Sequence, residues 1–434
     1  MVKVFLLVLS TSSISVLLFT DYGANGMVEN VKELLKLHEG IKHEVYLDNE
    51  NSTMVPQEVL DAMLPYYNKK AYGNPTLTHK PGWEAFTAIM ESSKKIADSI
   101  GAKNLEEINF TPGESEANNL ALMGATGANP AKGKKIVISE IEPINIINVT
   151  DLMKKQGYTT TKVPVTREEG LLDLEKLKEA VDKDTALVSI HLVNNEIGTI
   201  QPIKEAVAIV KDRNPEALFH TEASDAYGRI PFNVQDLKVD MATLSSFKIL
   251  GPRGSSALYI REGVNVERII EGPIGTQKLW PGIENTPAII GFTKASELAF
   301  SNFDANVAKM RRMRDKLVNG ILQTMTDIVL NGTKGEKRSP DNANISFRRC
   351  EGEALTIELS LKGVYVSSGS ACSRRLLQPS HVLVAIGRHF SEAHGSILMK
   401  VTRYNTEEDI NHALDSIPSS VERIRGIVGS TGVD

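Results

Sequence analysis

Short apolar, β-branched runs alternate with amphipathic stretches along the chain from about residue 84. The runs predict strands at residues 135–139, 186–193, 217–221, 239–244 and 257–260. Stretches between them, such as residues 174–181 and 204–211, have the periodicity of helices. Nearly continuous apolar strands separated by helices are typical of a mostly parallel sheet covered on both faces. Ligands of such sheets bind at the carboxyl ends of the strands, so we look for chemistry at strand-to-loop junctions.

The pattern changes after about residue 300. Residues 306–325 predict one long charged helix, residues 343–347 and 364–367 predict strands, and residues 407–426 predict a C-terminal helix. We interpret this part as a separate α+β domain. The predicted organisation is an apolar extension (1–26), a leading segment (27–60), a large domain (61–300) and a small domain (301–434).

Composition narrows the class of protein. The 434 residues include 41% apolar and 24% charged residues, as in ordinary soluble globular proteins. A net charge of −5, without a long basic run, argues against nucleic acid as a primary partner. Cys350 and Cys372 are the only cysteines, which excludes a disulfide framework and a four-cysteine zinc site. No metal site is predicted, and two thiols indicate a reducing, cytoplasmic compartment.

The first residues allow two interpretations. Residues 4–20 form an apolar run with a polar interruption and one preceding positive charge, Lys3. A signal peptide or membrane anchor is one interpretation, although the run is short for a membrane span. The other is an extension ahead of a domain whose sequence opens at Met27. We favour the extension, because the cysteine usage and the chemistry described below suit the cytoplasm.

Two candidate residues follow apolar strands. Lys248 lies between a strand and a Gly-Pro-x-Gly turn, where partial burial can make an amine nucleophilic. Spacing alone favours the alternative, a solvated lysine beside a turn. Glu222 ends the preceding strand, where a carboxylate can hold a protonated ring nitrogen. Its alternative is a carboxylate that caps a helix or turn.

Two further candidates lie in small-residue segments. Ser115 follows Pro112-Gly113 at the start of a helix, a position suited to phosphate, although first-turn acidic residues explain the segment without a ligand. Cys372 lies in a loop of small residues before Arg374 and Arg375, which favour the nucleophilic thiolate. Cys350 is interpreted as a structural thiol.

Taken together, these segments resemble the cysteine desulfurases of iron–sulfur cluster assembly, within the class V aminotransferase superfamily. The likeness runs from about residue 45 to 426, and the Ser-Ser-Gly-Ser-Ala-Cys loop is its most specific motif. It implies a type I pyridoxal-phosphate (PLP) transferase-like fold: a mostly parallel seven-stranded sheet covered by helices, with a smaller α+β domain. The landmarks are Tyr46-Leu47-Asp48, Gly73-Asn74-Pro75, His79, Phe110-Thr111, Asn119-Leu120-Ala121, Val193-Asn194-Asn195-Glu196-Ile197-Gly198, Lys248, Gly251-Pro252-Arg253-Gly254, the loop ending at Cys372, and Arg403-Tyr404-Asn405-Thr406.

The resemblance assigns roles to single residues. Lys248 would bind PLP covalently, Ser115 and Ser245 would hold its phosphate, and Asn195 would contact its phenolic oxygen and the substrate carboxylate. Cys372 would take sulfur from L-cysteine, becoming a persulfide and releasing alanine. The implied partners are a sulfur acceptor or cluster scaffold protein and a second copy of the chain in a homodimer.

Several positions depart from the family pattern. Pro143 stands where the family has a histidine over the cofactor ring, and Glu222 stands where it has aspartate. Asp225 replaces a glutamine and adds negative charge beside the expected phenolic oxygen. Other departures are Phe247 for a histidine, Leu398 for a substrate-binding arginine, and Trp280-Pro281-Gly282-Ile283 for Arg-x-Gly-Thr. Two alternatives therefore stay open: a different PLP-dependent lyase or aminotransferase, and a degenerate, non-catalytic sulfur-relay protein.

Overall fold

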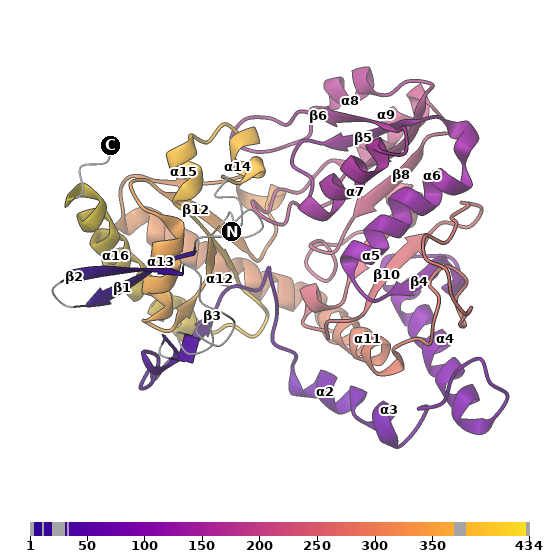
Figure 1. Cartoon of the computed structure of the whole chain (residues 1–434), viewed down its shortest axis with the longest axis horizontal. Helices are drawn as coiled ribbons and strands as arrows, with labels where there is room; N and C mark the ends of the chain where they lie inside the picture. The colour runs from indigo at the N-terminus through magenta and orange to yellow at the C-terminus, as the bar shows by residue number, and fades with distance from the viewer. Residues whose placement is uncertain (1–3, 11–12, 20–30, 33, 369–378, 431–434) are drawn as a thin grey trace.

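The larger part of the molecule is built around a seven-stranded sheet (Figure 1). The computed structural model describes residues 4–10, 13–19, 31–32, 34–368 and 379–430. The strand order is β4-β10-β9-β8-β7-β5-β6, and β10 alone runs antiparallel to its neighbours β4 and β9. The mostly parallel sheet expected from the sequence is confirmed. Its strands are β4 (Ile108–Thr111), β5 (Lys135–Ser139), β6 (Thr159–Val163), β7 (Thr185–Ser189), β8 (Leu218–Glu222), β9 (Met241–Ser245) and β10 (Ser256–Ile260).

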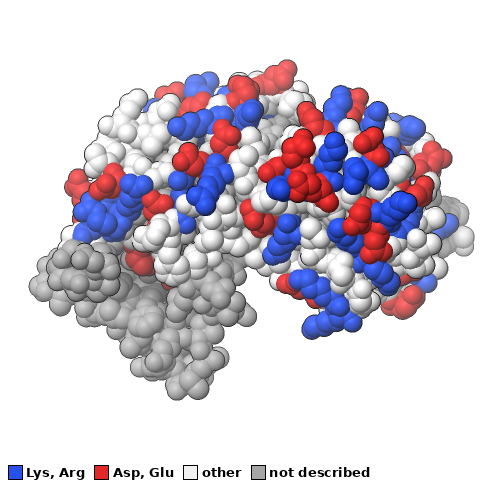
Figure 2. All heavy atoms as spheres, turned by 90° about the horizontal axis from the view of Figure 1, so that it is seen from above, with Lys and Arg blue, Asp and Glu red and all other residues white. Residues whose placement is uncertain are grey.

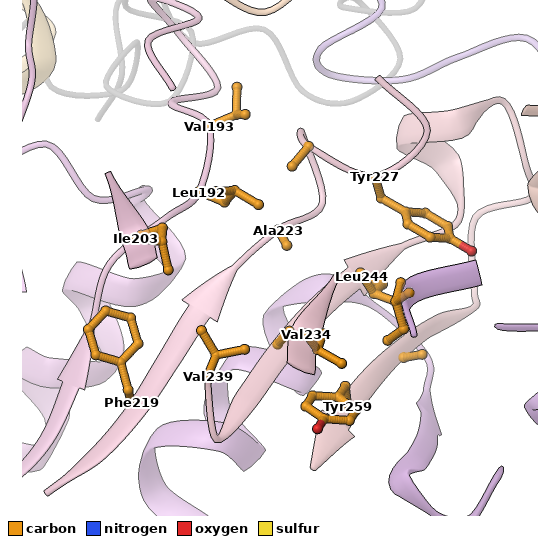
Figure 3. Packing of buried hydrophobic residues seen from close by; sticks show 14 of the residues in the cluster. Leu192, Val193, Ile203, Phe219, Ala223, Tyr227, Val234, Val239, Leu244 and Tyr259 are labelled. Atoms are coloured by element: carbon orange, nitrogen blue, oxygen red, sulfur yellow. The ribbon is translucent and has the colours of Figure 1, made fainter. Parts of the chain in front are cut away.

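Helices cover both faces of this sheet. Alternate strand residues point to opposite sides, so apolar residues on both sides need a helical layer to bury them. Phe219 and Tyr259 belong to one cluster of buried side chains (Figure 3), which also contains residues of α4, α8, α9 and α11. Their neighbours Leu218 and Leu258 pack in another cluster with α5 and α7. Both faces of the central strands β7, β8, β9 and β10 are thereby closed to water, which directs the search for chemistry to the strand ends. The helices of this part are α2 (Gln57–Met63), α3 (Pro65–Asn68), α4 (Lys80–Ile100), α5 (Glu114–Asn119), α6 (Ala125–Ala128), α7 (Ile144–Lys154), α8 (Leu174–Ala180), α9 (Ile203–Arg213), α10 (Val234–Leu237) and α11 (Thr286–Phe300).

A smaller α+β part has its own antiparallel sheet, ordered β11-β12-β15-β14. The N-terminal segment joins it, because β3 pairs in parallel with β13 and Val45 and Leu47 pack into its core. This pairing brings residues 45–50 beside the C-terminal part of the chain. The elements are β3 (Val45–Tyr46), α12 (Phe303–Thr324), β11 (Ile328–Leu330), β12 (Asn342–Phe347), α13 (Gly352–Ser360), β13 (Val364–Tyr365), β14 (Ser367–Ser368), α14 (His381–Ala385), α15 (Phe390–His394), β15 (Ser396–Lys400) and α16 (Glu407–Ser430).

The apolar N-terminal run forms a hairpin of two antiparallel strands, β1 (Val4–Ser10) and β2 (Ser13–Phe19). Among the helices that the structure describes, none has both the length and the apolar character needed to cross a membrane. Elsewhere, acidic and basic side chains are interspersed over the face seen in Figure 2.

Candidate active site

Lys248 lies three residues after the end of β9 and is buried, with only 5% of its surface exposed. Its Nζ lies 2.5 Å from Oε1 of Glu50 and 3.1 Å from Oδ2 of Asp225, and it donates a hydrogen bond to the backbone oxygen of Glu50 at 3.2 Å. The solvated-lysine alternative is therefore wrong. Burial lowers the pKa of this amine, but the charges of Asp225, Glu50 and Glu114 outweigh burial and raise the pKa above its ordinary value.

A second lysine shares the same two carboxylates. Lys400, at the end of β15, is buried; its Nζ lies 2.6 Å from Oε2 of Glu50 and also pairs with Oδ1 of Asp225. Two ammonium groups and two carboxylates thus alternate in a closed ring, which we call the four-charge ring (Glu50, Asp225, Lys248 and Lys400). Asn195 joins it from outside, because its side-chain nitrogen donates to Oε1 of Glu50 at 3.0 Å.

Backbone contacts place Glu50 in this ring. The amide of Lys400 donates to the carbonyl of Leu47 at 2.7 Å, and Asp48 forms an isolated parallel bridge with Lys400. The side chain of Asn49 donates to the carbonyl of Lys400 at 2.7 Å. Residues 47–49 therefore run along the end of β15, and this pairing sets the backbone position of the next residue, Glu50.

Arg229 completes the positive surroundings of Asp225. It lies 3.6 Å from Oδ1 of Asp225 and 2.7 Å from Asp341, and it donates to the backbone oxygen of Lys248 at 2.6 Å. Burial raises the pKa of Asp225, but Lys248, Lys400 and Arg229 outweigh burial and hold the pKa below its ordinary value. Asp225 thus adds a negative charge at this position, as the sequence indicates, and three cations surround it.

Two buried carboxyl groups beside the ring, Glu222 and Glu114, form no ion pair with any described residue. Burial, with the nearby charges of Glu114 and Asp225, raises the pKa of Glu222 well above its ordinary value. Burial likewise raises the pKa of Glu114, whose Oε1 accepts from Asn145 at 2.8 Å while its buried Oε2 has no hydrogen-bond partner among the described residues. Carboxyl groups of this kind fit a ligand that brings a positive or proton-donating group.

The structure brings Asn195 and Lys248 into direct contact with Glu50, and Lys248 also pairs with Asp225. Glu222 lies close enough to Asp225 for their charges to interact. Ser245 ends β9, three residues before Lys248.

The other predicted residues lie around this centre or outside the described chain. Ser115 is in the first turn of α5, next to Glu114. Pro143 precedes α7, and Asn145 of that helix contacts Glu114. Cys372 lies outside the described residues.

A buried pair holds the segment that contains Pro143. Glu142 accepts hydrogen bonds from Ser139 Oγ at 2.5 Å and from the backbone amide of His191, and His191 Nδ1 lies 2.9 Å from Glu142. Asn194 donates to the carbonyl of Ile141 at 3.0 Å. The loop after β5 is thereby joined to the loop that presents Asn195.

Sequence reasoning missed Glu50, Lys400, Arg229 and Glu114. One signal was available for Lys400, since it ends the apolar run Ser-Ile-Leu-Met-Lys, just as Lys248 follows an apolar strand. Glu50 lies in a polar segment, Asp-Asn-Glu-Asn-Ser, that marks no chemistry without its partners.

Comparison with known proteins identifies the family to which this site belongs. The model of the aminotransferase class-V family matches residues 45–412. The chain belongs to this family. It is 41% identical over 382 residues to "Cysteine desulfurase IscS 1" of Archaeoglobus fulgidus, covering 88% of this chain and 98% of that protein. It is 42% identical over 387 residues to "Cysteine desulfurase IscS" of Dictyoglomus turgidum, covering 89% and 97%.

Solved structures agree with this assignment. A structure titled "NIFS-LIKE PROTEIN" superposes with a TM-score of 0.80 at 32% identity, covering 89% of this chain and all of that one. A second, titled "SspA in complex with cysteine", has a TM-score of 0.72 at 29% identity, covering 83% of this chain and all of that one. The expected PLP-transferase type I-like fold is therefore confirmed.

The observed groups fit PLP, the cofactor on which this family depends. The cofactor needs a lysine, and Lys248 is buried at a strand end. It needs a carboxyl group for its ring nitrogen, and Glu222 lacks a cationic partner among the described residues. The buried hydroxyl of Ser224 also lacks a hydrogen-bond partner in this part of the structure.

Proposed function

We propose that this chain is a PLP-dependent cysteine desulfurase, which takes sulfur from L-cysteine, releases L-alanine and carries the sulfur as a persulfide on Cys372. One observation carries the proposal: a buried lysine, Lys248, follows a central strand in a chain that is 41–42% identical to named cysteine desulfurases over nearly all of its length. The substrate, L-cysteine, follows from those names and from the cysteine complex among the related structures.

Each predicted site residue has a place in this proposal. Lys248 would bind the cofactor covalently, Glu222 would face its ring nitrogen, and Ser115 and Ser245 would hold its phosphate. Asn195 would contact its phenolic oxygen and the substrate. Pro143 would cover the ring, and Asp225 would lie beside the phenolic oxygen with its charge balanced by neighbouring cations. When bound, PLP supplies an electron sink that makes the carbon–sulfur bond of cysteine cleavable.

The amine of Lys248 must lose a proton before it attacks an aldehyde, and its surroundings favour the protonated form. The carboxylates of Glu50 and Asp225 lie within hydrogen-bond distance of Nζ and stabilise the ammonium group. Both stay paired with Lys400 after the proton leaves Lys248. The amine is also shielded from bulk water, which protects a bond that water would hydrolyse.

The described residues on either side of the segment that contains Cys372 contact elements of this site. The segment follows β14, which pairs with β15, the strand that ends at Lys400. It precedes Ser380, whose hydroxyl donates to Glu196 at 2.6 Å, next to Asn195. Because both flanking residues contact the site, we propose that the thiol of Cys372 reacts there. The role of this thiol in taking up sulfur is proposed from the sequence of its loop.

A homodimer is part of the proposal, with a sulfur acceptor or cluster scaffold as a further partner. Large apolar side chains between residues 64 and 86 are exposed, among them Leu64, Tyr67, Tyr72, Leu77, Trp83 and Phe86. Such a concentration is typical of a protein–protein interface. Sedimentation at micromolar concentration tests the dimer, and a monomer would contradict it. The location proposed is the cytoplasm, which cell fractionation tests.

Spectroscopy and two substitutions test the function. Purified protein with PLP should show a visible absorption band and, when supplied with cysteine and a thiol reductant that reduces the persulfide, should produce alanine and sulfide. Lys248→Ala should abolish the band, whereas Cys372→Ser should keep it and stop sulfur transfer. Cys350→Ala is the matched control, because Cys350 is buried in the core of the smaller part and should leave transfer intact.

The alternatives give different results. If no band forms even with added PLP, the non-catalytic sulfur-relay interpretation is favoured. A band without alanine or sulfide would favour another PLP-dependent lyase or aminotransferase. Sulfide release by Cys372→Ser at the normal rate would refute the role of that thiol.

A further inference from the structure

Lys400 has the same partners as Lys248. Each ammonium group contacts one oxygen of Glu50 and one oxygen of Asp225, and each carboxylate uses its two oxygens for the two lysines. Lys400 is itself buried, so that its charge is poorly screened by water. Lys400 comes from the smaller part of the molecule and Lys248 from the larger.

We infer that Lys400 is a positioning residue: it holds Glu50 and Asp225 as partners shared with Lys248, and so lets the Lys248 nitrogen release its proton more easily than two unshared carboxylates would. The inference rests on the proposed function, because the nitrogen must exchange its proton to bind the cofactor. Without Lys400, Lys248 would be the one ammonium group paired with both buried carboxylates, and Arg229 would remain beside Asp225. Such a nitrogen would hold its proton tightly and react slowly.

The other charged groups around Lys248 do not replace Lys400. Glu114, from α5, raises the pKa of Lys248 further, which opposes loss of its proton. Glu222, at the end of β8, is a carboxyl group and adds no positive charge. Arg229 is positive, but its ion pairs are with Asp225 and Asp341, and it contacts Lys248 only through the backbone oxygen. Within the described residues, Lys400 is therefore the cation that pairs with both carboxylate partners of Lys248.

The test uses PLP-loaded protein without substrate and measures the midpoint pH at which the visible absorption of the lysine-bound cofactor changes. Lys400→Met should raise this midpoint by about one to two pH units, because a nearby positive charge is lost. Lys400→Arg keeps the charge and should leave the midpoint close to that of the wild type. Lys211→Met is the matched control: Lys211 pairs with Asp240 at 2.8 Å, at the opposite end of β9 from Lys248.

If the Lys400→Met protein does not fold, a second pair of variants tests the same inference. Glu50→Gln and the double variant Glu50→Gln, Lys400→Met both leave Asp225 as the one carboxylate of the ring. The double variant should have the higher midpoint, by about one pH unit.

An equal midpoint with and without Lys400 would overturn the inference. It would also fail if Lys400→Met weakened cysteine binding at an unchanged midpoint, because Lys400 would then be a binder of the substrate carboxylate. A wild-type protein without a visible band would instead refute the proposed function, which is a different result.

Discussion

Replacing Asp225 by asparagine tests whether charge holds the four-charge ring together. The substitution keeps the size of the side chain and removes one negative charge from a site that is closed to water. Lys248 and Lys400 would then share Glu50 alone, and Arg229 would retain Asp341. One buried positive charge would therefore be left without a partner, which lowers the free energy of unfolding.

The distances give the size of this effect. At an effective dielectric constant of about 20, charges 3.1 Å apart, as for Lys248 and Asp225, attract by about 5 kcal/mol. Desolvation offsets much of that attraction, and removing one partner of a buried pair costs about 3–5 kcal/mol. Because Glu50 and Asp341 still balance part of the charge, we expect a loss near the lower end, about 3 kcal/mol.

Urea unfolding of cofactor-free protein, followed by circular dichroism, measures this loss. The pKa of Asp225 is held below its ordinary value, so its stabilisation is complete above about pH 4 and declines as the pH falls further. The difference between wild type and Asp225→Asn should therefore be constant from pH 7 to 5 and shrink in more acidic solution.

Asp98→Asn is the control, because Asp98 pairs with Lys94 on the exposed surface of α4 and should contribute less than about 0.5 kcal/mol. Equal stability of wild type and Asp225→Asn at pH 7 would refute the reasoning. So would a stability difference that does not change with acid.

Two other substitutions test the loop around Asn195. Burial raises the pKa of Glu196 to about 8, so the unfolded chain releases a proton that the folded protein keeps, and the free energy of unfolding should fall as the pH rises from about 5 to 8. Glu196→Gln should lack this decline in urea unfolding, and parallel pH curves would contradict it. Gly198 has a φ of +70°, and a Cβ there would lie 2.7 Å from the Cβ of Asn342, so Gly198→Ala should lower stability by about 2–4 kcal/mol. Gly157→Ala, with positive φ and open space, should lose only about 1 kcal/mol in the same assay, and equal losses would refute the predicted clash.

The sequence alone was sufficient for the central strands. Residues 135–139 were predicted with the bounds that β5 has, and the predicted strands nearest to β7, β8, β9 and β10 overlap the observed ones. These strands are buried on both faces, and at least three of the five residues are apolar in β5, β7, β9 and β10, so the apolar run marks the strand. β6 was missed because it is an edge strand, Thr-Thr-Thr-Lys-Val, with a partly exposed surface that polar residues tolerate.

In the site, too, only residues with a local sequence signal could be predicted. Lys248 and Glu222 could be proposed as candidates because each lies at or shortly after the end of an apolar strand, which is a local signal, whereas Ser245 was named only through the family resemblance. The ring of charges has no local signal, because Glu50 and Lys400 are separated by 350 residues. They meet only where β3 pairs with β13 and residues 47–49 run along β15. The strand patterns thus indicated the central strands and the strand end near which Lys248 lies, while tertiary pairing alone decided which charges surround that lysine, because a buried ammonium group takes its partners from whatever the fold brings within about 4 Å.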